Sequence, residues 1–579
     1  MFQLPNSIRC IPNHDTTTMA TSKLLLDYVY DHESARADQV YLTQPLGAAA
    51  NGAVTDYTWK ETMNQARRMA THLQSLGFEP GARIAILSKN CAHFFMAELA
   101  IWMAGYTTVA IFPTEGADTV KFVLDHSESS LLFVGKLDTW DKQLPGVAAS
   151  LPRIAFPLAP KTSYDNWDAI IGRTAPMPGR PQRKATDLAM LLYTSGSTGQ
   201  PKGVMHSFSR ISAVSEGIAR RMADTLGTEA NRVLSYLPLA HAFERAFVEC
   251  YSYVVGNCHV FFAESLETFV VDLNRARPTL FISVPRLWLK FMQGVSAKMP
   301  PAKLNRLLSI PIIKRIVARK VLTTLGLDQV KLAGSGSAPL SPSLIQWYRK
   351  LGLNLIEGYA MTEDFAYSHT MTETHNEVGY VGVPYDGVQV RIGDGNEIQI
   401  KSPGQMVGYY KRPDLDAEVF TEDGFFKTGD QGERRPDGQL KITGRLKELF
   451  KTAKGKYVAP APIENRLNGH PMIESSMVSG VGQAASYGLI VLNEAMRPKM
   501  NDPAVRAEVT EAMTALLNET NKDLADYEQM KMLVIAKEPW SIENGCLTPT
   551  MKIKRGKIEA QVAPQVDAWF EGKGKVLWA

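Results

Sequence analysis

The chain has 579 residues and a mass of 64.0 kDa, with 45 % apolar and 21 % charged residues, as in ordinary soluble globular proteins. This composition excludes a disordered, collagen-like or coiled-coil chain, and the length predicts about three to four structural units. The 63 Lys and Arg residues nearly balance the 59 Asp and Glu residues, and the net charge of +4 gives no reason to expect a nucleic-acid partner.

The N-terminal region and the cysteines indicate the compartment. Residues 1–20 contain no apolar stretch of the kind found in a secretory signal, and we expect them to be disordered. The most apolar window, Met96–Phe112, includes Glu98 and is too short to span a bilayer, so it predicts a buried helix that leads into a strand. The five cysteines form no CxxC pair, which favours reduced thiols over disulfides or zinc. We therefore expect a cytoplasmic protein without a transmembrane segment. Peripheral contact with a membrane stays open, and the oligomeric state is not indicated.

Apolar runs and amphipathic segments alternate from about Thr21 to Leu440. Arg83–Leu87, Val109–Phe112 and Leu131–Val134 are continuous apolar runs typical of buried strands, and Trp59–Leu76 has the spacing of an amphipathic helix. Buried strands that alternate with helices predict an α/β fold, in which helices cover mainly parallel sheets.

The pattern changes after Asp386. Three short strands, Val388–Arg391, Glu397–Lys401 and Gln439–Thr443, are separated by glycine-containing turns, which predicts a small antiparallel, β-barrel-like module at about 386–443. Charged helices and short strands then alternate to the C-terminus. We expect a large N-terminal domain over 21–445 and a small, mobile α+β domain over 446–579.

The segment LLYTSGSTGQPKGVMHS at Leu191–Ser207 carries the strongest chemical signal. Glycines let backbone N–H groups approach an anion, hydroxyls add donors and a lysine adds charge, so the segment suits a polyphosphate. The alternative is a flexible Gly/Ser loop. The segment lacks the G-x-x-x-x-G-K-[ST] spacing of P-loop NTPases, and Gly334–Pro339 (GSGSAP) lacks the third glycine of a dinucleotide-binding turn.

The segment TSGSTGQPKG resembles the signature loop of the adenylate-forming superfamily of acyl-CoA synthetases, peptide-synthetase adenylation domains and luciferases. Further segments match in the family's order across most of the chain. Two of these, YLPLAHAFER and ISVPRLW, look like the long-chain fatty acyl-CoA synthetase branch. The matching segments are Tyr236–Arg245 (YLPLAHAFER), Ile282–Trp288 (ISVPRLW), Gly358–Glu363 (GYAMTE), Thr428–Asp430 (TGD), Gly444–Lys447 (GRLK), Gly455–Pro460 (GKYVAP) and Leu547–Arg555 (LTPTMKIKR).

The resemblance implies an ATP-dependent ligase that converts a fatty acid to an acyl-adenylate and then to a thioester, with ATP, Mg²⁺ and coenzyme A as cofactors. Its nucleotide site would comprise Thr194, Ser195, Gly196, Ser197, Thr198, Gly199, Lys202, Gly336, Ser337, Tyr359, Thr362, Asp430, Arg445 and Lys552. Within this set, residues 194–202 would hold the β- and γ-phosphates, and Tyr359 would stack on adenine. Asp430 would accept the ribose hydroxyls, with Arg445 on the ribose or phosphate side.

The catalytic residues implied by the resemblance are Thr362 at the α-phosphate, Glu363 as the Mg²⁺ ligand, His241 and Lys552. A carboxylate is an oxygen ligand of the kind Mg²⁺ prefers. An ammonium group at the reacting atoms would neutralise the two anionic reactants. Lys554 remains the alternative to Lys552.

The acyl and CoA sites follow from the same resemblance. His241, Trp288 and Ala360 would border the acyl pocket, with Trp288 as a gate, although a tryptophan at this position is also explained by core packing. Lys447 would be the hinge about which the C-terminal domain turns, and Gly455 would border the CoA tunnel, although it also fits a simple turn. Ala360 and Ser337 depart from the smaller residues common in the family.

Three other functions remain as alternatives to a medium- to long-chain fatty acid–CoA ligase. A fatty acyl-AMP ligase that loads a carrier protein often has an insertion after the segment Gly444–Lys447, and none is visible here. An aryl-CoA ligase would share the adenylation residues. A non-catalytic nucleotide- or fatty-acid-binding protein would be expected to lack Lys202, Glu363, Asp430 or Lys552, and all four are present.

Overall fold

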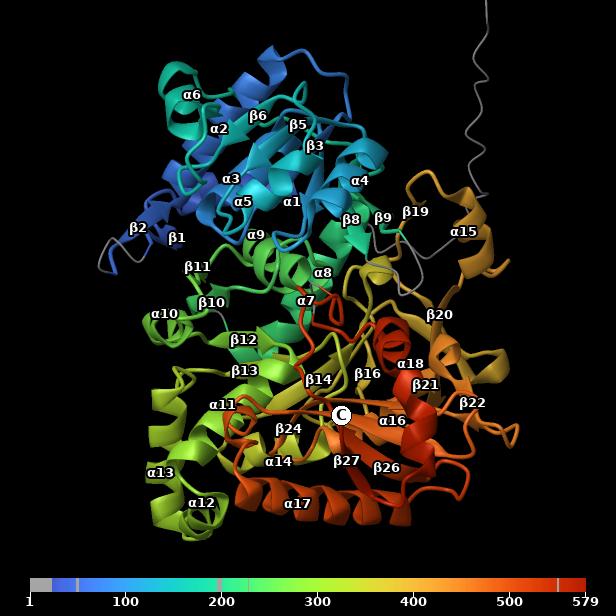
Figure 1. Cartoon of the computed structure of the whole chain (residues 1–579). Helices are drawn as coiled ribbons and strands as arrows, with labels where there is room; N and C mark the ends of the chain where they lie inside the picture. Colours follow the sequence, from blue (N-terminus) through green and yellow to red (C-terminus); the bar gives the residue numbers. More distant parts are fainter. Residues whose placement is uncertain (1–22, 48–51, 195–199, 228, 549–550) are drawn as a thin grey trace, which may run out of the picture.

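The computed structural model describes residues 23–47, 52–194, 200–227, 229–548 and 551–579 (Figure 1). The expectation of a disordered N-terminus at 1–20 falls outside these ranges. Within them, no helix combines the length and apolar character that a membrane span requires. The four cysteines described, Cys91, Cys250, Cys258 and Cys546, are free and buried.

The largest sheet has eight strands in the order β19-β9-β8-β4-β3-β5-β6-β7, and the run from β8 to β7 is parallel. Its outer pair, β9 and β19, is antiparallel. The strands are β3 (Arg83–Leu87), β4 (Thr107–Ile111), β5 (Ser129–Val134), β6 (Arg153–Ala155), β7 (Asp165–Asn166), β8 (Leu188–Thr194), β9 (Lys202–Ser207) and β19 (Gly408–Tyr409). The mainly parallel sheet expected from the sequence is confirmed.

Helices cover both faces of this sheet, which explains its continuous apolar strands. Ile84 and Ile86 of β3 pack in one core with α2 (Trp59–Ser75) and α3 (Ala92–Met103). The alternate residues Ala85 and Leu87 pack in another core, with α4 (Ala117–Ser127) and α5 (Trp140–Gln143). The window predicted as a helix leading into a strand is α3 followed by β4.

Two further mixed sheets complete the upper and central parts of the molecule (Figure 1). One has the order β10-β11-β1-β2 and the other β12-β13-β14-β15-β16. Their strands are β1 (Val40–Pro45), β2 (Val54–Thr58), β10 (Asn231–Ser235), β11 (Cys258–Phe262), β12 (Leu280–Ser283), β13 (Leu332–Ser335), β14 (Leu355–Tyr359), β15 (His369–Thr370) and β16 (Val383–Pro384).

The strands expected to form a barrel-like module make an antiparallel four-stranded sheet, β17-β18-β20-β21. The pairings found in the described residues leave β17 and β21 at its edges, so the sheet is open. Its strands are β17 (Gln389–Ile392), β18 (Glu397–Lys401), β20 (Phe426–Arg434) and β21 (Leu440–Arg445). β20 and β21 carry Asp430 and Arg445.

Helices of the N-terminal part connect these sheets. Helix α2 begins where Thr58 accepts a bond from the Glu61 N–H and Glu61 accepts one from the Thr58 N–H, a reciprocal cap. The other helices are α1 (Leu25–Ala35), α6 (Trp167–Arg173), α7 (Phe208–Leu226), α8 (Ala242–Glu244), α9 (Tyr251–Val255), α10 (Phe269–Ala276), α11 (Pro285–Lys298), α12 (Pro301–Leu308), α13 (Pro311–Thr324), α14 (Pro342–Lys350) and α15 (Pro413–Val419).

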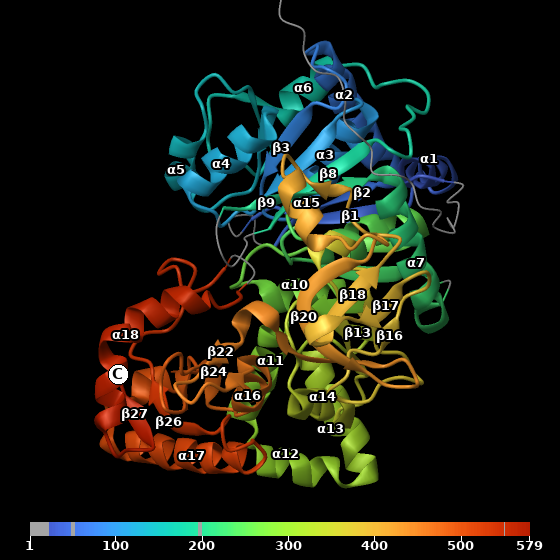
Figure 2. The same ribbon diagram turned by 90° about the vertical axis from the view of Figure 1, so that its right-hand side faces the viewer.

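The segment after β21 forms a sheet of its own, β24-β25-β26-β27, beside the hairpin β22-β23 (Figure 2). Two apolar clusters fill its faces. The elements are β22 (Phe450–Lys451), β23 (Tyr457–Val458), α16 (Pro460–Leu467), β24 (Ile473–Ser479), β25 (Ser486–Leu492), α17 (Pro503–Lys522), β26 (Met530–Ile535), α18 (Arg555–Glu571) and β27 (Val576–Trp578).

Candidate functional site

A cavity of about 2130 Å³ lies where the N-terminal sheets meet the C-terminal segment. Most of the residues predicted from the sequence line it. These are Thr194, Lys202, His241, Gly336, Ser337, Tyr359, Ala360, Thr362, Glu363, Asp430, Arg445, Lys447 and Lys552. Ser195, Gly196, Ser197, Thr198 and Gly199 lie outside the described residues. The residues on either side of them, Thr194 and Lys202, pair across β8 and β9. Trp288 and Gly455 are not on the cavity wall.

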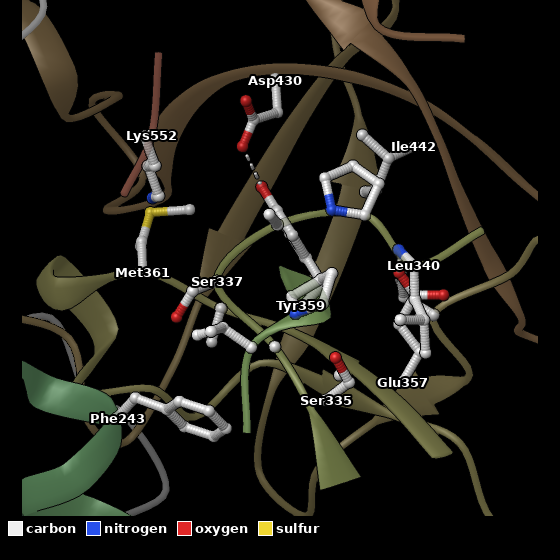
Figure 3. A pocket seen from close by; sticks show the side chains of 18 of the residues that line it. Phe243, Ser335, Ser337, Leu340, Glu357, Tyr359, Met361, Asp430, Ile442 and Lys552 are labelled. Carbon is white, nitrogen blue, oxygen red and sulfur yellow. Dashed lines mark hydrogen bonds between the residues drawn. The ribbon is translucent and has the colours of Figure 1, made fainter. Parts of the chain in front are cut away.

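Asp430 is fixed from two sides, and Figure 3 shows one of them, its bond with Tyr359. The Tyr359 hydroxyl donates to Asp430 Oδ2 at 2.8 Å, and Arg445 Nε donates to Asp430 Oδ1 at 2.6 Å. Asp430 and Arg445 are partners in the register of β20 and β21, so the antiparallel sheet itself sets this pair. The Asp430 carboxylate raises the pKa of Arg445, and burial raises the pKa of Tyr359, so both groups stay protonated. Each carboxylate oxygen keeps a lone pair that could accept a ligand hydroxyl.

Glu363 lies in the short turn Thr362–Asp364, after β14 ends at Tyr359. Its Oε1 accepts a bond from the Tyr409 hydroxyl at 2.8 Å, and Lys202 Nζ lies 5.1 Å from the centre of the same tyrosine ring. Tyr409 therefore connects the loop lysine to the carboxylate. We did not identify it from the sequence, because nothing distinguishes it from the adjacent Tyr410.

The Glu363 carboxylate fits a Mg²⁺ ion that is shared with phosphates. Its second oxygen has no protein partner in the described residues, and those residues contain no cluster of three metal-ligating side chains. Mg²⁺ commonly takes one or two carboxylates and completes its shell with phosphates and water. The Glu363 carboxylate, with Thr362 next to it, matches that pattern. The ion would neutralise phosphate charge there.

Lys552 enters the cavity from the C-terminal segment (Figure 3). Its loop is closed by Thr548 N–H donating to the Lys552 carbonyl at 2.8 Å and Lys552 N–H donating to Thr548 Oγ1 at 3.1 Å. Desolvation by the surrounding protein, followed by the Arg445 charge, lowers the pKa of Lys552, while Asp430 and Glu363 oppose this shift. Lys552 thus lies within the electrostatic field of three residues that the sequence predicts for the ATP and Mg²⁺ sites.

The neighbouring Lys554 faces a different group. Its charge acts on Glu115, whose pKa is raised by burial and lowered in part by Thr119 and by Lys554. Lys554 also precedes helix α18 as its N-cap. These surroundings favour Lys552 over Lys554 as the lysine near the reacting atoms.

Arg555 anchors the Lys552 loop, and we did not identify this role from the sequence. Arg555 Nη2 donates to Glu464 Oε1 at 2.8 Å, and its Nη1 donates to the Val478 carbonyl at 2.8 Å. Glu448 lies 3.7 Å from Arg555 Nη2 and 3.9 Å from Arg445 Nη1. Glu448 therefore lies between Arg445, the partner of Asp430, and Arg555, which holds the segment of Lys552.

His241 presents a neutral imidazole to the cavity. Its Nδ1 accepts the Phe243 N–H at 3.2 Å, so the proton is on Nε2. Burial, assisted by the Lys552 charge, lowers the pKa of His241 to about 3. His241 can therefore donate a hydrogen bond to a carboxylate but carries no charge at neutral pH.

The last two residues of YLPLAHAFER anchor the segment instead of lining the acyl site. Glu244 accepts bonds from Ser235 Oγ at 2.7 Å and the Tyr236 N–H at 3.1 Å. The Arg245 guanidinium is fully buried, donates to Glu98 and, at 2.7 Å, to Glu249, and begins a π-helical stretch, Arg245–Cys250. This buried network fixes the backbone that carries His241.

Trp288 is a core residue in this structure. Its side chain is 0 % exposed, its ring contacts that of Tyr348 edge-on at 4.9 Å, and its carbonyl accepts the Tyr348 hydroxyl at 2.7 Å. The cavity wall nearby is apolar and is formed by Phe243, Phe247, Ile282, Leu332 and Ile356. Packing explains Trp288, and its role as a gate remains a prediction without support from this geometry.

Backbone conformation explains two small residues. Ser337 has φ of +69°, a region where glycine is favoured, which accounts for the smaller residues expected at this position. Gly455 has φ of +76°, and a Cβ there would meet only Lys451 Cε at 3.9 Å, so glycine is required by the turn and not by crowding in this conformation. Its place beside a CoA tunnel stays a prediction, as does the hinge at Lys447, in the turn Leu446–Glu448.

Two family models match the chain in sequence. Residues 34–410 match the AMP-binding enzyme model, and residues 448–574 match the AMP-binding enzyme C-terminal domain. The chain is 30 % identical to the long-chain-fatty-acid–CoA ligase FadD15 of Mycobacterium bovis, over 94 % of this chain and 96 % of that protein. It is also 30 % identical to long chain acyl-CoA synthetase 6, peroxisomal, of Arabidopsis thaliana, over 90 % of this chain and 83 % of that protein.

Solved structures share the fold. The A-PCP didomain of carboxylic acid reductase from Segniliparus rugosus, in complex with AMP, has a TM-score of 0.78 at 21 % identity and covers 95 % of this chain and 82 % of its own. The anthranilate CoA ligase AuaEII, in complex with anthranoyl-AMP, has a TM-score of 0.75 at 18 % identity, with 94 % and 98 % covered. The two-part α/β architecture expected from the sequence is confirmed.

Proposed function

This chain belongs to the AMP-binding enzyme family, and from that premise we propose that it is a medium- to long-chain fatty acid–CoA ligase. A fatty acid carboxylate oxygen attacks the α-phosphorus of ATP, the bond to the β-phosphate breaks, and acyl-AMP and pyrophosphate form. The CoA thiol then attacks the acyl carbon, loses its proton and displaces AMP. Two curated relatives named for long-chain acids, each 30 % identical over most of both chains, support this choice of substrate.

One observation carries the proposal: Lys552 lies in the same cavity as the Asp430–Tyr359–Arg445 cluster and Glu363. Asp430 would bind the ribose, Lys202 and the loop before it the β- and γ-phosphates, and Glu363 the Mg²⁺ ion. Lys552 would stabilise charge at the α-phosphate and the attacking carboxylate. His241 and Ala360 would adjoin the acid, and the apolar wall at Phe247 would take its chain.

The second half-reaction requires a rearrangement that we also propose. Lys552 lines the cavity, so the position of the C-terminal segment seen here would suit adenylation. Turning the domain 446–579 about Lys447 would withdraw Lys552 and bring the turn at Gly455 toward the acyl-adenylate. The contacts of Glu448 with Arg445 and Arg555 would then break.

The test is pyrophosphate release across a panel of carboxylic acids, with and without CoA. We expect straight-chain acids from hexanoate to palmitate to outperform benzoate-type acids, and acyl-CoA to form when CoA is added. Faster turnover of benzoate-type acids would make the chain an aryl-CoA ligase. Acyl-AMP that CoA does not consume, but a carrier-protein thiol does, would identify a carrier-loading ligase. No pyrophosphate release with any acid would favour a binding protein.

A further inference from the structure

The hairpin of helices α12 and α13 has an unusual composition. Residues 298–327, which run from the last residue of α11 through the hairpin, contain no Asp or Glu but seven cations: Lys298, Lys303, Arg306, Lys314, Arg315, Arg319 and Lys320. The whole chain is nearly balanced in charge, so this is a strong local excess. The hairpin lies at an outer edge of the molecule in both views (Figures 1 and 2).

The outer side of the hairpin also exposes large apolar side chains. Ile310 is 43 %, Ile312 77 % and Ile316 65 % exposed. Ile312 and Ile316 are four residues apart on α13 and therefore lie on one face. The inner side already contributes Leu304, Leu308, Ala318 and Val321 to a core cluster. The exposed isoleucines are thus additional to those that hold the hairpin in place.

The cations of the hairpin have no acidic partners in the part of the chain that the structure describes. None of the seven side chains takes part in the ion pairs formed there, whereas cations of adjoining elements do. Arg277 pairs with Asp328 at the base of the hairpin, and Lys290 of α11 lies 3.6 Å from Glu494. The hairpin therefore presents uncompensated positive charge around exposed isoleucines.

We propose that the α12–α13 hairpin docks this protein onto an anionic lipid surface. A basic amphipathic helix with large apolar side chains binds in the interface plane, with its apolar side chains at the acyl boundary and its cations among the headgroups. Charge complementarity selects anionic over zwitterionic lipid, and the exposed isoleucines favour a bilayer over a purely polar polyanion. Helix α11 connects this surface to the cavity, because Pro285, Arg286 and Leu289 near its start line the cavity wall.

The experiment is sedimentation of the full-length protein with phosphatidylcholine vesicles, with and without phosphatidylserine, at low and high salt. We expect binding only to the serine-containing vesicles and weaker binding at high salt. The double variant Arg315→Glu with Arg319→Glu should lower vesicle affinity at least about tenfold. Ile312→Ser with Ile316→Ser should also weaken it, without removing the preference for anionic lipid.

The matched control is Lys60→Glu with Lys161→Glu, two exposed lysines on other elements, which changes net charge equally. It should retain most of the wild-type affinity. An equal loss of vesicle affinity in the control would mean that net charge alone attracts the protein. Failure of the wild-type protein to bind anionic vesicles would overturn the proposal. Pyrophosphate release with a short, soluble acid should be unchanged in all variants, which separates this proposal from the proposed function.

Discussion

Asp430 and Arg445 face each other across β20 and β21, with Arg445 Nε 2.6 Å from Asp430 Oδ1. Arg445 is also the last residue of β21, immediately before the turn that contains Lys447. Arg445, which holds the Asp430 carboxylate that we propose binds ribose, is therefore two residues from the proposed hinge. The proposed nucleotide site and the proposed hinge thus share one short segment.

Tyr359→Phe should weaken ATP binding while the fold stays intact. The substitution removes only the hydroxyl that donates to Asp430, and a hydrogen bond to a charged group contributes about 1.5–3 kcal/mol. The KM for ATP should therefore rise by roughly tenfold to a hundredfold. Tyr410→Phe, which removes a hydroxyl at exposed Glu128, is the control and should leave this KM unchanged. If Tyr359→Phe leaves the KM for ATP unaltered, the bond from Tyr359 to Asp430 does not contribute to nucleotide binding.

Lys552→Ala should slow acyl-adenylate formation by about 10²–10³-fold, the effect of removing one charge-stabilising contact. Thioester formation from supplied acyl-adenylate should be largely retained, because the lysine acts only in the first step. Lys554→Ala should keep most adenylation, since its charge acts on Glu115. Single-turnover assays of each half-reaction measure both effects. The assignment fails if Lys554→Ala is the more damaged variant or if both steps fall equally in Lys552→Ala.

Lys447→Pro should preserve adenylation and impair thioester formation. Lys447 lies in the 3₁₀ turn Leu446–Glu448, whose usual φ of about −50 to −70° suits proline. Proline fixes φ and restricts the preceding residue, so a hinge that must adopt two backbone conformations would be restrained. Lys447→Ala is the control for loss of the side chain. Wild-type rates of CoA transfer in Lys447→Pro would place the hinge elsewhere.

Glu357→Gln should change how stability depends on pH. Burial raises the pKa of Glu357 to about 8, and its Oε1 accepts the Leu340 N–H at 2.8 Å, a bond that glutamine can keep. Between the unfolded pKa of about 4.5 and the folded value, the native state holds the extra proton, so wild type loses stability as pH rises. Glu357→Gln, which has no titrating carboxyl at this position, does not lose stability in this way. Its free energy of unfolding relative to wild type should increase from pH 5 to pH 8 by on the order of a few kcal/mol. A pH-independent difference in chemical denaturation would show that Glu357 titrates normally.

Phe247 and Trp288 should respond differently to truncation. Phe247→Ala removes a side chain from the cavity wall and so enlarges the cavity. The preferred acid should shift to longer chains, because each additional CH₂ that is buried contributes about 0.8 kcal/mol. Trp288→Ala removes a core residue and should cost about 3–5 kcal/mol in the free energy of unfolding, with little change in chain-length preference. Specific activity across the acid series, together with denaturation, measures both. A large change of preference in Trp288→Ala, at full stability, would restore its role as a gate.

Local sequence patterns predicted the elements well where burial is continuous. Arg83–Leu87 is β3 with those bounds, because a strand covered on both faces reads as an unbroken apolar run. Helix α2 likewise follows the apolar spacing of Trp59–Leu76 and ends one residue earlier, at Ser75. The sequence predicted a barrel-like module where the structure has an open antiparallel sheet. Turn residues predict hairpins, but they do not indicate whether the outer strands of a sheet meet.

Motif residues such as Asp430 and Lys552, which the sequence predicts for the site, both line the cavity, while their chemical roles stay predictions. Residues that act through others carried no such signal. Tyr409 reaches Glu363 across 46 residues, and Arg555 reaches Glu464 across 91, so only the tertiary fold brings these pairs together. Trp288 was open to two interpretations because the sequence does not say which side of α11 faces the cavity.

Oxygen transfer from the acid tests the central claim most directly. Palmitate labelled with ¹⁸O in its carboxylate is incubated with ATP, Mg²⁺, CoA and the protein, and the AMP is analysed by mass spectrometry. If the carboxylate attacks the α-phosphate and the thiol then displaces AMP, one labelled oxygen remains on each AMP. Label in pyrophosphate or inorganic phosphate, or unlabelled AMP formed together with palmitoyl-CoA, would contradict adenylation at this site.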